Sequence, residues 1–135
     1  MAVKGIHHLA VAVTDLDEAI ATYGRLFGAR LEHRDTVSEQ GVEAAAVLVG
    51  ESRIELLAAT ADDTPVGRFL ARRGPGMHHV AYEVDDLEAQ LEALDGQGVE
   101  LIDREPRRGL YGLEVAFLHP DAADGVLSEL VSRAG

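Results

Sequence analysis

Two histidine pairs in strand-like sequence are the first candidates for chemistry. His7-His8 and His78-His79 each occur in a short apolar run, and Glu55 and Glu129 stand beside leucines in later runs. Successive side chains of a strand point to opposite faces, so one histidine of each pair can face a shared interior. An imidazole or a carboxylate buried there needs a hydrogen-bond partner or a cation.

His8, Glu55, His79 and Glu129 together could hold a divalent metal ion. Two imidazoles and two carboxylates match a first-row metal site that leaves positions open for substrate or water. The alternative is that all four are solvent-facing members of alternating strands. An internal repeat favours the metal site, because it duplicates both residue types at corresponding places.

The repeat has an offset of 71 residues. Gly5–Leu16 reads GIHHLAVAVTDL and Gly76–Leu87 reads GMHHVAYEVDDL, with seven of the twelve positions identical. The same offset relates Gly41-Val42-Glu43 to Gly112-Leu113-Glu114. Two matches at one offset indicate that one supersecondary unit occurs twice.

Each copy is predicted to contain a strand, a helix and three more strands, from its hydrophobic spacing and its turn and cap residues. The first has strands at Ile6–Val13, Leu31–Arg34, Val42–Val49 and Arg53–Ala58, with a helix capped by Thr14 or Asp15 and ended by Gly28. The second has strands at His78–Val84, Val99–Ile102, Leu113–Leu118 and Val126–Val131, with a helix capped by Asp85 or Asp86 and ended by Gly98. A short linker helix begins at Thr64-Pro65 and runs through Phe69 and Leu70.

These elements predict an α+β fold. We expect two tandem βαβββ modules that form an eight-stranded curved, barrel-like mixed sheet with helices outside. Residues 1–135 would form a single domain, with modules at about 4–60 and 75–133 and a helical linker at 61–74.

Composition excludes several classes of function. The formal net charge of −12 argues against general nucleic-acid binding and against anionic membrane surfaces. The absence of cysteine excludes disulfides and thiolate metal sites. No apolar run approaches the ~20 residues that span a bilayer, and the first residues lack a signal-peptide pattern. We therefore expect a cytoplasmic protein with a small-molecule substrate.

The chain resembles the vicinal oxygen chelate (glyoxalase/bleomycin resistance/dioxygenase) superfamily, with the greatest similarity to the methylmalonyl-CoA epimerase family. The similarity rests on the paired histidine strands, the duplicated module, and five segments that span nearly the whole chain. They are IHHLAVAVTDLDEAI, EQGVEAAAVLVGESRIELL, TPVGRFLARRGPGMHHVAYEVDDLEA, EPRRG and FLHPDAADGVLSELV.

The resemblance implies a metal-dependent isomerase. His8, Glu55, His79 and Glu129 occupy the metal-ligand positions, and the ion could be cobalt, manganese, nickel, iron or zinc. The implied reaction is epimerisation of methylmalonyl-CoA, or of a similar 2-substituted malonyl thioester, by α-proton abstraction through a metal-stabilised enolate. The resemblance also implies an acyl-CoA substrate and a homodimer.

The candidate proton-transfer residues depart from the family pattern. Some epimerases carry a proposed catalytic glutamate four residues after the glutamine of the EQGV segment, where this chain has Ala44. Glu43 is one residue earlier and could reach the site only through a β-bulge. We keep Glu43 and Glu129 as candidate proton-transfer residues.

Charge also departs from the family pattern near the expected CoA site. Glu114 and Asp121 replace residues that are often basic in the family, whereas Arg107 and Arg108 remain as candidate substrate-binding residues. One alternative function is therefore another metal-dependent isomerase or lyase that acts on a non-CoA chelating substrate. A second is a ligand-sequestering resistance protein, which three Phe, three Tyr and no Trp disfavour because such binders often build an aromatic cavity.

Overall fold

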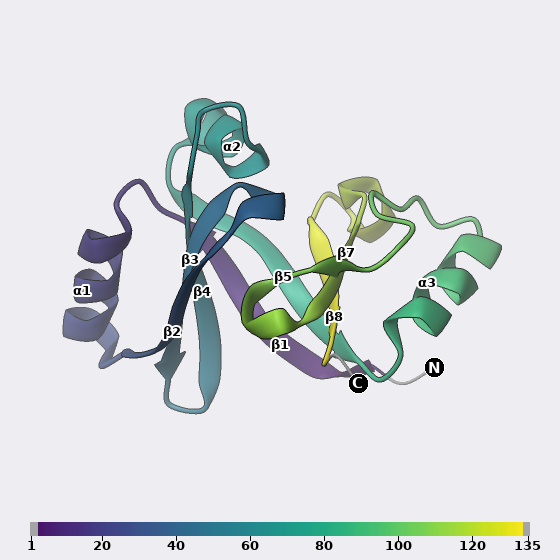
Figure 1. Cartoon of the computed structure of the whole chain (residues 1–135), viewed down its shortest axis with the longest axis horizontal. Helices are drawn as coiled ribbons and strands as arrows, with labels where there is room; N and C mark the ends of the chain where they lie inside the picture. The colour runs from purple at the N-terminus through teal and green to yellow at the C-terminus, as the bar shows by residue number, and fades with distance from the viewer. Residues whose placement is uncertain (1–2, 134–135) are drawn as a thin grey trace. The chain divides into compact units, whose positions relative to one another are not determined.

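A strand, a helix and three strands follow one another twice along the chain (Figure 1). The computed structural model describes residues 3–133. The first module consists of β1 (Val3–Ala12), α1 (Leu16–Phe27), β2 (Arg30–Val37), β3 (Val42–Val49) and β4 (Ser52–Ala59). The second consists of β5 (Gly76–Val84), α3 (Leu87–Gly96), β6 (Arg107–Arg108), β7 (Glu114–Leu118) and β8 (Ser128–Ser132). Between them lies α2 (Pro65–Arg73).

The chain divides into two compact units, which we describe separately. The N-terminal unit comprises residues 8–78, and the C-terminal unit comprises residues 79–133 together with 3–7. Strand order is β2-β3-β4-β1 in the N-terminal unit, and β5-β8-β7-β6 in the C-terminal unit. In both, the first strand of the module pairs in parallel with the last, and the remaining pairs are antiparallel. The predicted α+β class and the duplicated βαβββ module are confirmed.

Local signals in the sequence explain where the helices begin and end. The side chains of Asp15 and Asp86 accept hydrogen bonds from backbone N–H groups three residues later, at the starts of α1 and α3. Thr64 caps α2 in the same way, with Pro65 as the first helical residue. Gly28 ends α1 in the left-handed conformation, as predicted.

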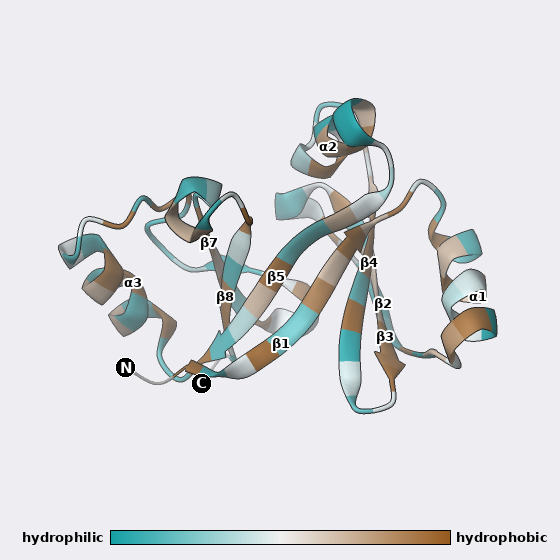
Figure 2. Cartoon of the chain, turned by 180° about the vertical axis from the view of Figure 1, so that it is seen from behind, coloured by the Kyte–Doolittle hydropathy of each residue, from teal (hydrophilic) through white to brown (hydrophobic). Residues whose placement is uncertain are grey.

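Each long helix covers one face of the strands in its own unit. Leu16 of α1 packs with Val47 of β3 and Leu56 of β4. Leu87 and Leu91 of α3 pack with Ala116, Leu130 and Val84 in the same manner. Hydrophilic segments interrupt the hydrophobic colouring of β1 and β5, the strands that carry the histidine pairs (Figure 2). The faces turned away from the helices are therefore available for polar chemistry.

One predicted strand is wrong. Val99–Ile102 does not form a continuous strand: only Leu101 makes an isolated bridge, to Leu118, and the two-residue β6 forms further along the chain. Pro106 lacks an N–H donor, and the Asp103 side chain takes up a backbone donor of β7, so the pairing is interrupted between Leu101 and β6. No helix within residues 3–133 is long and apolar enough to cross a membrane.

Substitution of the glycine in the EQGV turn should destabilise the fold more than substitution of a second turn glycine. Gly41 has φ of 66°, and a Cβ atom there would lie 2.9 Å from Thr64 Cβ at the start of α2. Gly50 has φ of 60° but no atom within 4 Å of such a Cβ. Gly50→Ala should cost about 1–2 kcal/mol from backbone strain alone. Gly41→Ala should cost about 1–3 kcal/mol more because of overpacking.

Urea denaturation of both variants would measure this difference in the free energy of unfolding. Equal destabilisation by the two substitutions would show that the contact between the turn and α2 has no energetic weight.

Candidate functional site

In the N-terminal unit, a buried histidine and a buried glutamate meet on neighbouring parallel strands. Ala10 of β1 is the register partner of Glu55 in β4, which places His8 on the same face as Glu55. His8 Nδ1 lies 3.3 Å from Glu55 Oε2, and the two side chains are 2% and 9% exposed. The strand pairing thus holds two ionisable groups together away from water.

The C-terminal unit repeats this arrangement. Ala81 of β5 is the register partner of Glu129 in β8, and His79 Nε2 lies 3.2 Å from Glu129 Oε1. The His79 and Glu129 side chains are 3% and 4% exposed. The Phe117 ring meets the imidazole of His79 edge-on, with ring centroids 5.1 Å apart and planes at 89°.

The strand register shows that the two glutamates occupy equivalent positions. Their partners Ala10 and Ala81 are 71 residues apart, whereas Glu55 and Glu129 are 74 apart. The three extra residues fall between β7 and β8, where a 3-10 turn at Pro120–Ala123 replaces the tight turn between β3 and β4. The spacing mismatch is therefore an insertion in a connection and leaves the site positions unchanged.

On β3, small side chains lie beside Glu55. Ala46 of β3 lies directly opposite Glu55, and Ala44 lies on the same face two residues earlier. Both alanines are buried. Within residues 42–49, β3 therefore supplies this face with no carboxylate.

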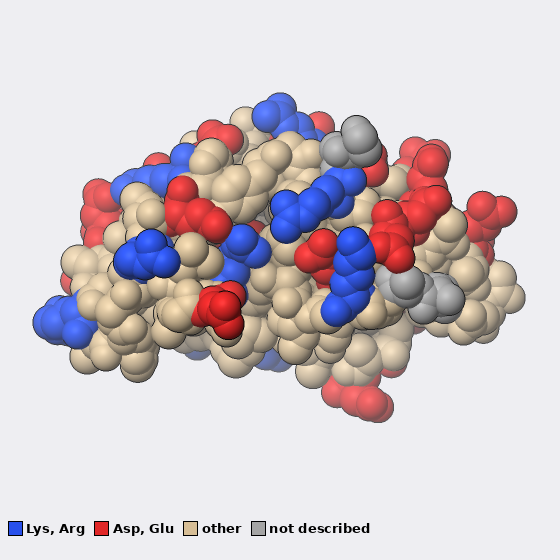
Figure 3. Space-filling view, turned by 90° about the horizontal axis from the view of Figure 1, so that it is seen from below, with Lys and Arg blue, Asp and Glu red and all other residues tan. Residues whose placement is uncertain are grey.

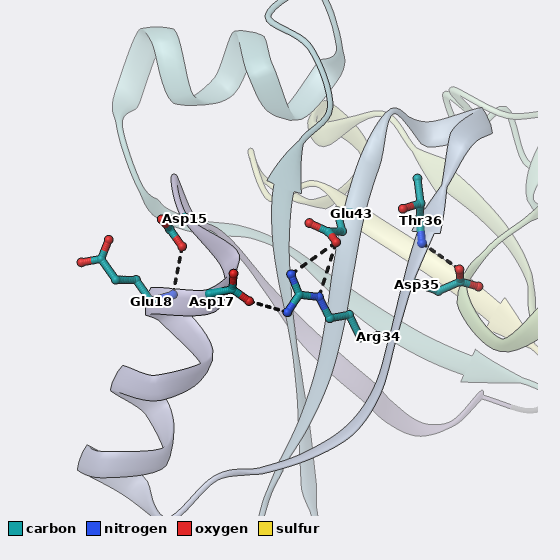
Figure 4. A network of polar contacts seen from close by, with 7 residues as sticks. All are labelled: Asp15, Asp17, Glu18, Arg34, Asp35, Thr36 and Glu43. Carbon is teal, nitrogen blue, oxygen red and sulfur yellow. Dashed lines mark hydrogen bonds and ion pairs between the residues drawn. The ribbon is translucent and has the colours of Figure 1, made fainter.

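Glu43 points to the other face of β3, toward α1. The register between β3 and β4 runs without a shift over the whole of Val42–Val49, so the β-bulge that would turn Glu43 to the Glu55 face is absent from this strand. Arg34 of β2 instead bonds the Glu43 carboxylate at 3.3 Å and also binds Asp17 of α1 (Figure 4).

The Arg34 network is structural. The hydrogen bond to Asp17 raises the pKa of the Arg34 guanidinium above its usual value, with the Coulomb attraction of Asp17 and Glu43 adding to it. A group whose pKa is raised by folding stabilises the folded state at pH values below its pKa in the unfolded chain. This stabilisation is lost only as the pH rises through its pKa in the folded state. Arg34 therefore stays charged across the neutral range and ties α1 to β2 and β3.

The two predicted substrate-binding arginines lie on opposite faces of β6. Arg107 pairs with Val115, which packs with Ala81 and Val131 on the His79 side. Arg108 pairs with Glu114 and so points the other way. Basic side chains lie among acidic ones on the molecular face in Figure 3, so the net charge of −12 does not make that face uniformly negative.

Arg107 also has a partner that was not anticipated. Its Nη1 donates to Asp103 Oδ1 at 3.3 Å, and the other Asp103 oxygen accepts a backbone hydrogen bond from Phe117 at 2.9 Å. Asp103 and Phe117 did not emerge from the sequence, because neither lies in the histidine or glutamate pattern. Phe117 could have been found as the repeat equivalent of Ala46, at the offset of 71.

The residues of each pair suit a divalent metal ion. Imidazole nitrogen and carboxylate oxygen are donors for first-row metals. Two donors bound to one ion at about 2.1 Å and at right angles lie about 3.0 Å apart, close to the separations of 3.2 and 3.3 Å seen here. Burial of both carboxylates also favours a cation nearby.

A family assignment agrees with this arrangement. Residues 7–117 match the family model of the Glyoxalase/Bleomycin resistance protein/Dioxygenase superfamily. The chain belongs to this superfamily. The match includes the two histidine pairs and Glu55, and it extends to Phe117.

Within the superfamily, the chain is similar to methylmalonyl-CoA epimerases. It is 36% identical to the human mitochondrial methylmalonyl-CoA epimerase, over 93% of this chain and 72% of the human protein. It is 38% identical to a crystal structure of the Mycobacterium tuberculosis methylmalonyl-CoA epimerase, with a TM-score of 0.94 over 98% of this chain and 90% of the other. A methylmalonyl-CoA epimerase in complex with methylmalonyl-CoA and NH4+ is 35% identical, with a TM-score of 0.95 over 99% and 97%.

Proposed function

We propose that this chain is a metal-dependent epimerase of methylmalonyl-CoA or of a similar 2-substituted malonyl thioester. The observation that carries the proposal is the pair of buried His–Glu contacts, at equivalent positions of a duplicated module. The similarity to methylmalonyl-CoA epimerases over nearly the whole chain supports this choice of substrate.

The proposal assigns both pairs to one ion. Each pair offers only two donors, whereas a first-row ion with open positions for a substrate usually takes three or four protein ligands. His8, Glu55, His79 and Glu129 would then be the ligands. The similarity to an epimerase in complex with methylmalonyl-CoA supports the assignment.

The reaction asks the site to remove a weakly acidic proton. A thioester α-carbon does not release its proton to a carboxylate at neutral pH unless the resulting negative charge is stabilised. The bound ion would supply that electrostatic stabilisation. Glu129 has two carboxylate oxygens, so one can serve as a ligand while the other exchanges a proton, and we propose it as a proton-transfer group.

In the C-terminal unit, Arg107 would be one of the residues that contact the substrate. Its position on the Val115 face suits contact with an anionic group of the substrate, whereas Arg108 faces away. Glu114 and Asp121 add negative charge to this unit, which keeps a second candidate open: a metal-dependent isomerase or lyase that acts on a chelating substrate without CoA.

Removing one ligand should abolish metal retention. His79→Ala takes away a buried imidazole and leaves Glu129 without its neighbour, so the variant should lose Co2+ on gel filtration while keeping its far-UV circular dichroism. His33→Ala is the control, because it removes a histidine of β2 that lies beside Asp35 and belongs to neither His–Glu pair. Elemental analysis of the fractions gives the metal content.

Two results would contradict this prediction. Wild-type protein that binds neither cobalt nor manganese would refute the metal proposal itself. A His79→Ala variant that retains metal like the wild type would refute the ligand assignment only.

Deuterium exchange at the α-carbon of methylmalonyl-CoA tests the reaction. In heavy water, the cobalt-loaded protein should catalyse the exchange. Glu43→Gln should keep the rate within about threefold, a barrier change below about 0.7 kcal/mol, because Glu43 lies on the α1 face. Glu129→Gln at saturating cobalt should slow it by about 100-fold or more, the usual weight of a general acid–base group.

A matched thioester that lacks the nucleotide part of CoA separates the two candidate functions. No exchange with methylmalonyl-CoA would refute the epimerase proposal. Equal exchange with both thioesters would show that the CoA phosphates are not recognised, which would favour the second candidate.

A further inference from the structure

The segment after α3 holds one residue of β7 by its backbone. The N–H groups of Ile102 and Asp103 both donate to the carbonyl of Phe117, at 3.0 and 3.1 Å. In return, the Phe117 N–H donates to Asp103 Oδ2 at 2.9 Å. Both backbone polar groups of Phe117 are therefore satisfied by this segment, which precedes β6 in the chain.

The Asp103 carboxylate is itself fixed in place. Its second oxygen accepts a hydrogen bond from Arg107, and its side chain is 11% exposed. A hydrogen bond to an ionised carboxylate that is partly shielded from water is stronger than a neutral bond at the surface. Arg107 and Asp103 together form a brace against β7.

The held residue contacts the proposed metal ligands. The Phe117 ring lies edge-on to the His79 imidazole, 5.1 Å between centroids, and Phe117 is the direct cross-strand partner of Glu129. An edge-to-face contact of this kind restricts rotation of the imidazole about its side-chain bonds. The backbone position of Phe117 thus sets the orientation available to His79.

The residues of the N-terminal unit that correspond to this brace are of different types. At the offset of 71 residues, Ala46 is the repeat equivalent of Phe117, and Glu32 is the repeat equivalent of Asp103. Ala46 lies opposite Glu55, and its side chain is only a methyl group. The Oε1 atom of Glu32 accepts a hydrogen bond from Arg53 Nε at 2.7 Å. The duplicated module therefore differs between its copies at the residues that flank the glutamate.

We propose that Phe117 and Asp103 are positioning residues that hold His79 in its ligating orientation. The Phe117 side chain has no donor atom, and both Asp103 oxygens accept hydrogen bonds from Arg107 and Phe117, so in this proposal both residues act through His79. The inference rests on the proposed metal site, and it adds the residues that pre-organise one half of that site. Groups that orient a metal ligand typically change affinity by about 10–100-fold when removed.

Calorimetric titration with Co2+ tests the inference. Asp103→Ala and Phe117→Leu should each weaken cobalt binding by about 10–100-fold. Asp103→Asn should restore most of the affinity, because the amide oxygen can still accept the Phe117 N–H. Glu32→Ala is the matched control: it removes an ion pair of the N-terminal unit and should change affinity by less than about threefold, below 0.7 kcal/mol.

A second readout uses the metal-free protein. With 13C- and 15N-labelled histidine, the His79 ring signals should shift and broaden in Asp103→Ala and Phe117→Leu, while those of His33 should stay unchanged. Far-UV circular dichroism verifies that each variant is folded. The same signals in Asp103→Asn should resemble those of the wild type.

The outcomes separate the inference from the proposed function. Wild-type cobalt affinity and unchanged His79 signals in Asp103→Ala and Phe117→Leu would overturn the inference and leave the metal site intact. Failure of the wild type to bind cobalt would overturn the proposed function, and the histidine signals would still decide whether Phe117 and Asp103 orient the ring.

Discussion

Burial of two carboxylates beside two imidazoles is the constraint on which the rest of the structure depends. Glu55 and Glu129 lie within apolar strands, and their register partners in the parallel neighbouring strand are Ala10 and Ala81. An ionised carboxylate in such surroundings is unfavourable unless a cation or a hydrogen-bond donor meets it. The parallel pairing of the first and last strand of each module brings the histidine to the required place, and both copies keep this pairing while other parts diverge.

Divergence between the copies concerns what surrounds the pairs. In the N-terminal copy, β3 places alanines beside Glu55, and Arg34 joins α1 to β2 and β3. In the C-terminal copy, the counterpart of β2 is interrupted. Residues 102 and 103 of this segment hydrogen-bond to the backbone of Phe117, whose ring contacts the His79 imidazole. The duplicated module thus provides two equivalent His–Glu pairs whose surroundings are not equivalent.

The sequence predicted the repeated part of the structure well, because periodicity, caps and equivalent residues reinforce one another. Asp15, Asp86 and Gly28 act as their residue types indicate. The strand predicted over residues 99–102 is wrong. Its apolar residues have the pattern of a strand, but next to it the Asp103 side chain, and not a backbone carbonyl, accepts the N–H of Phe117 in β7. A long-range contact of this kind leaves no local signal. The register equivalence of Glu55 and Glu129 was likewise masked by three inserted residues.

The chemistry of position 44 follows from the same geometry. Alternation along β3 puts Ala44 and Ala46 on the Glu55 face and sends Glu43 to Arg34. A carboxylate one residue away in sequence is therefore separated from the site by the thickness of the sheet, and no side-chain rotation can return it. On the Glu55 face, β3 presents only apolar side chains, so a proton-transfer group of the proposed site must come from another strand. Glu129, on β8, is a carboxylate that the strand pairing already places beside an imidazole.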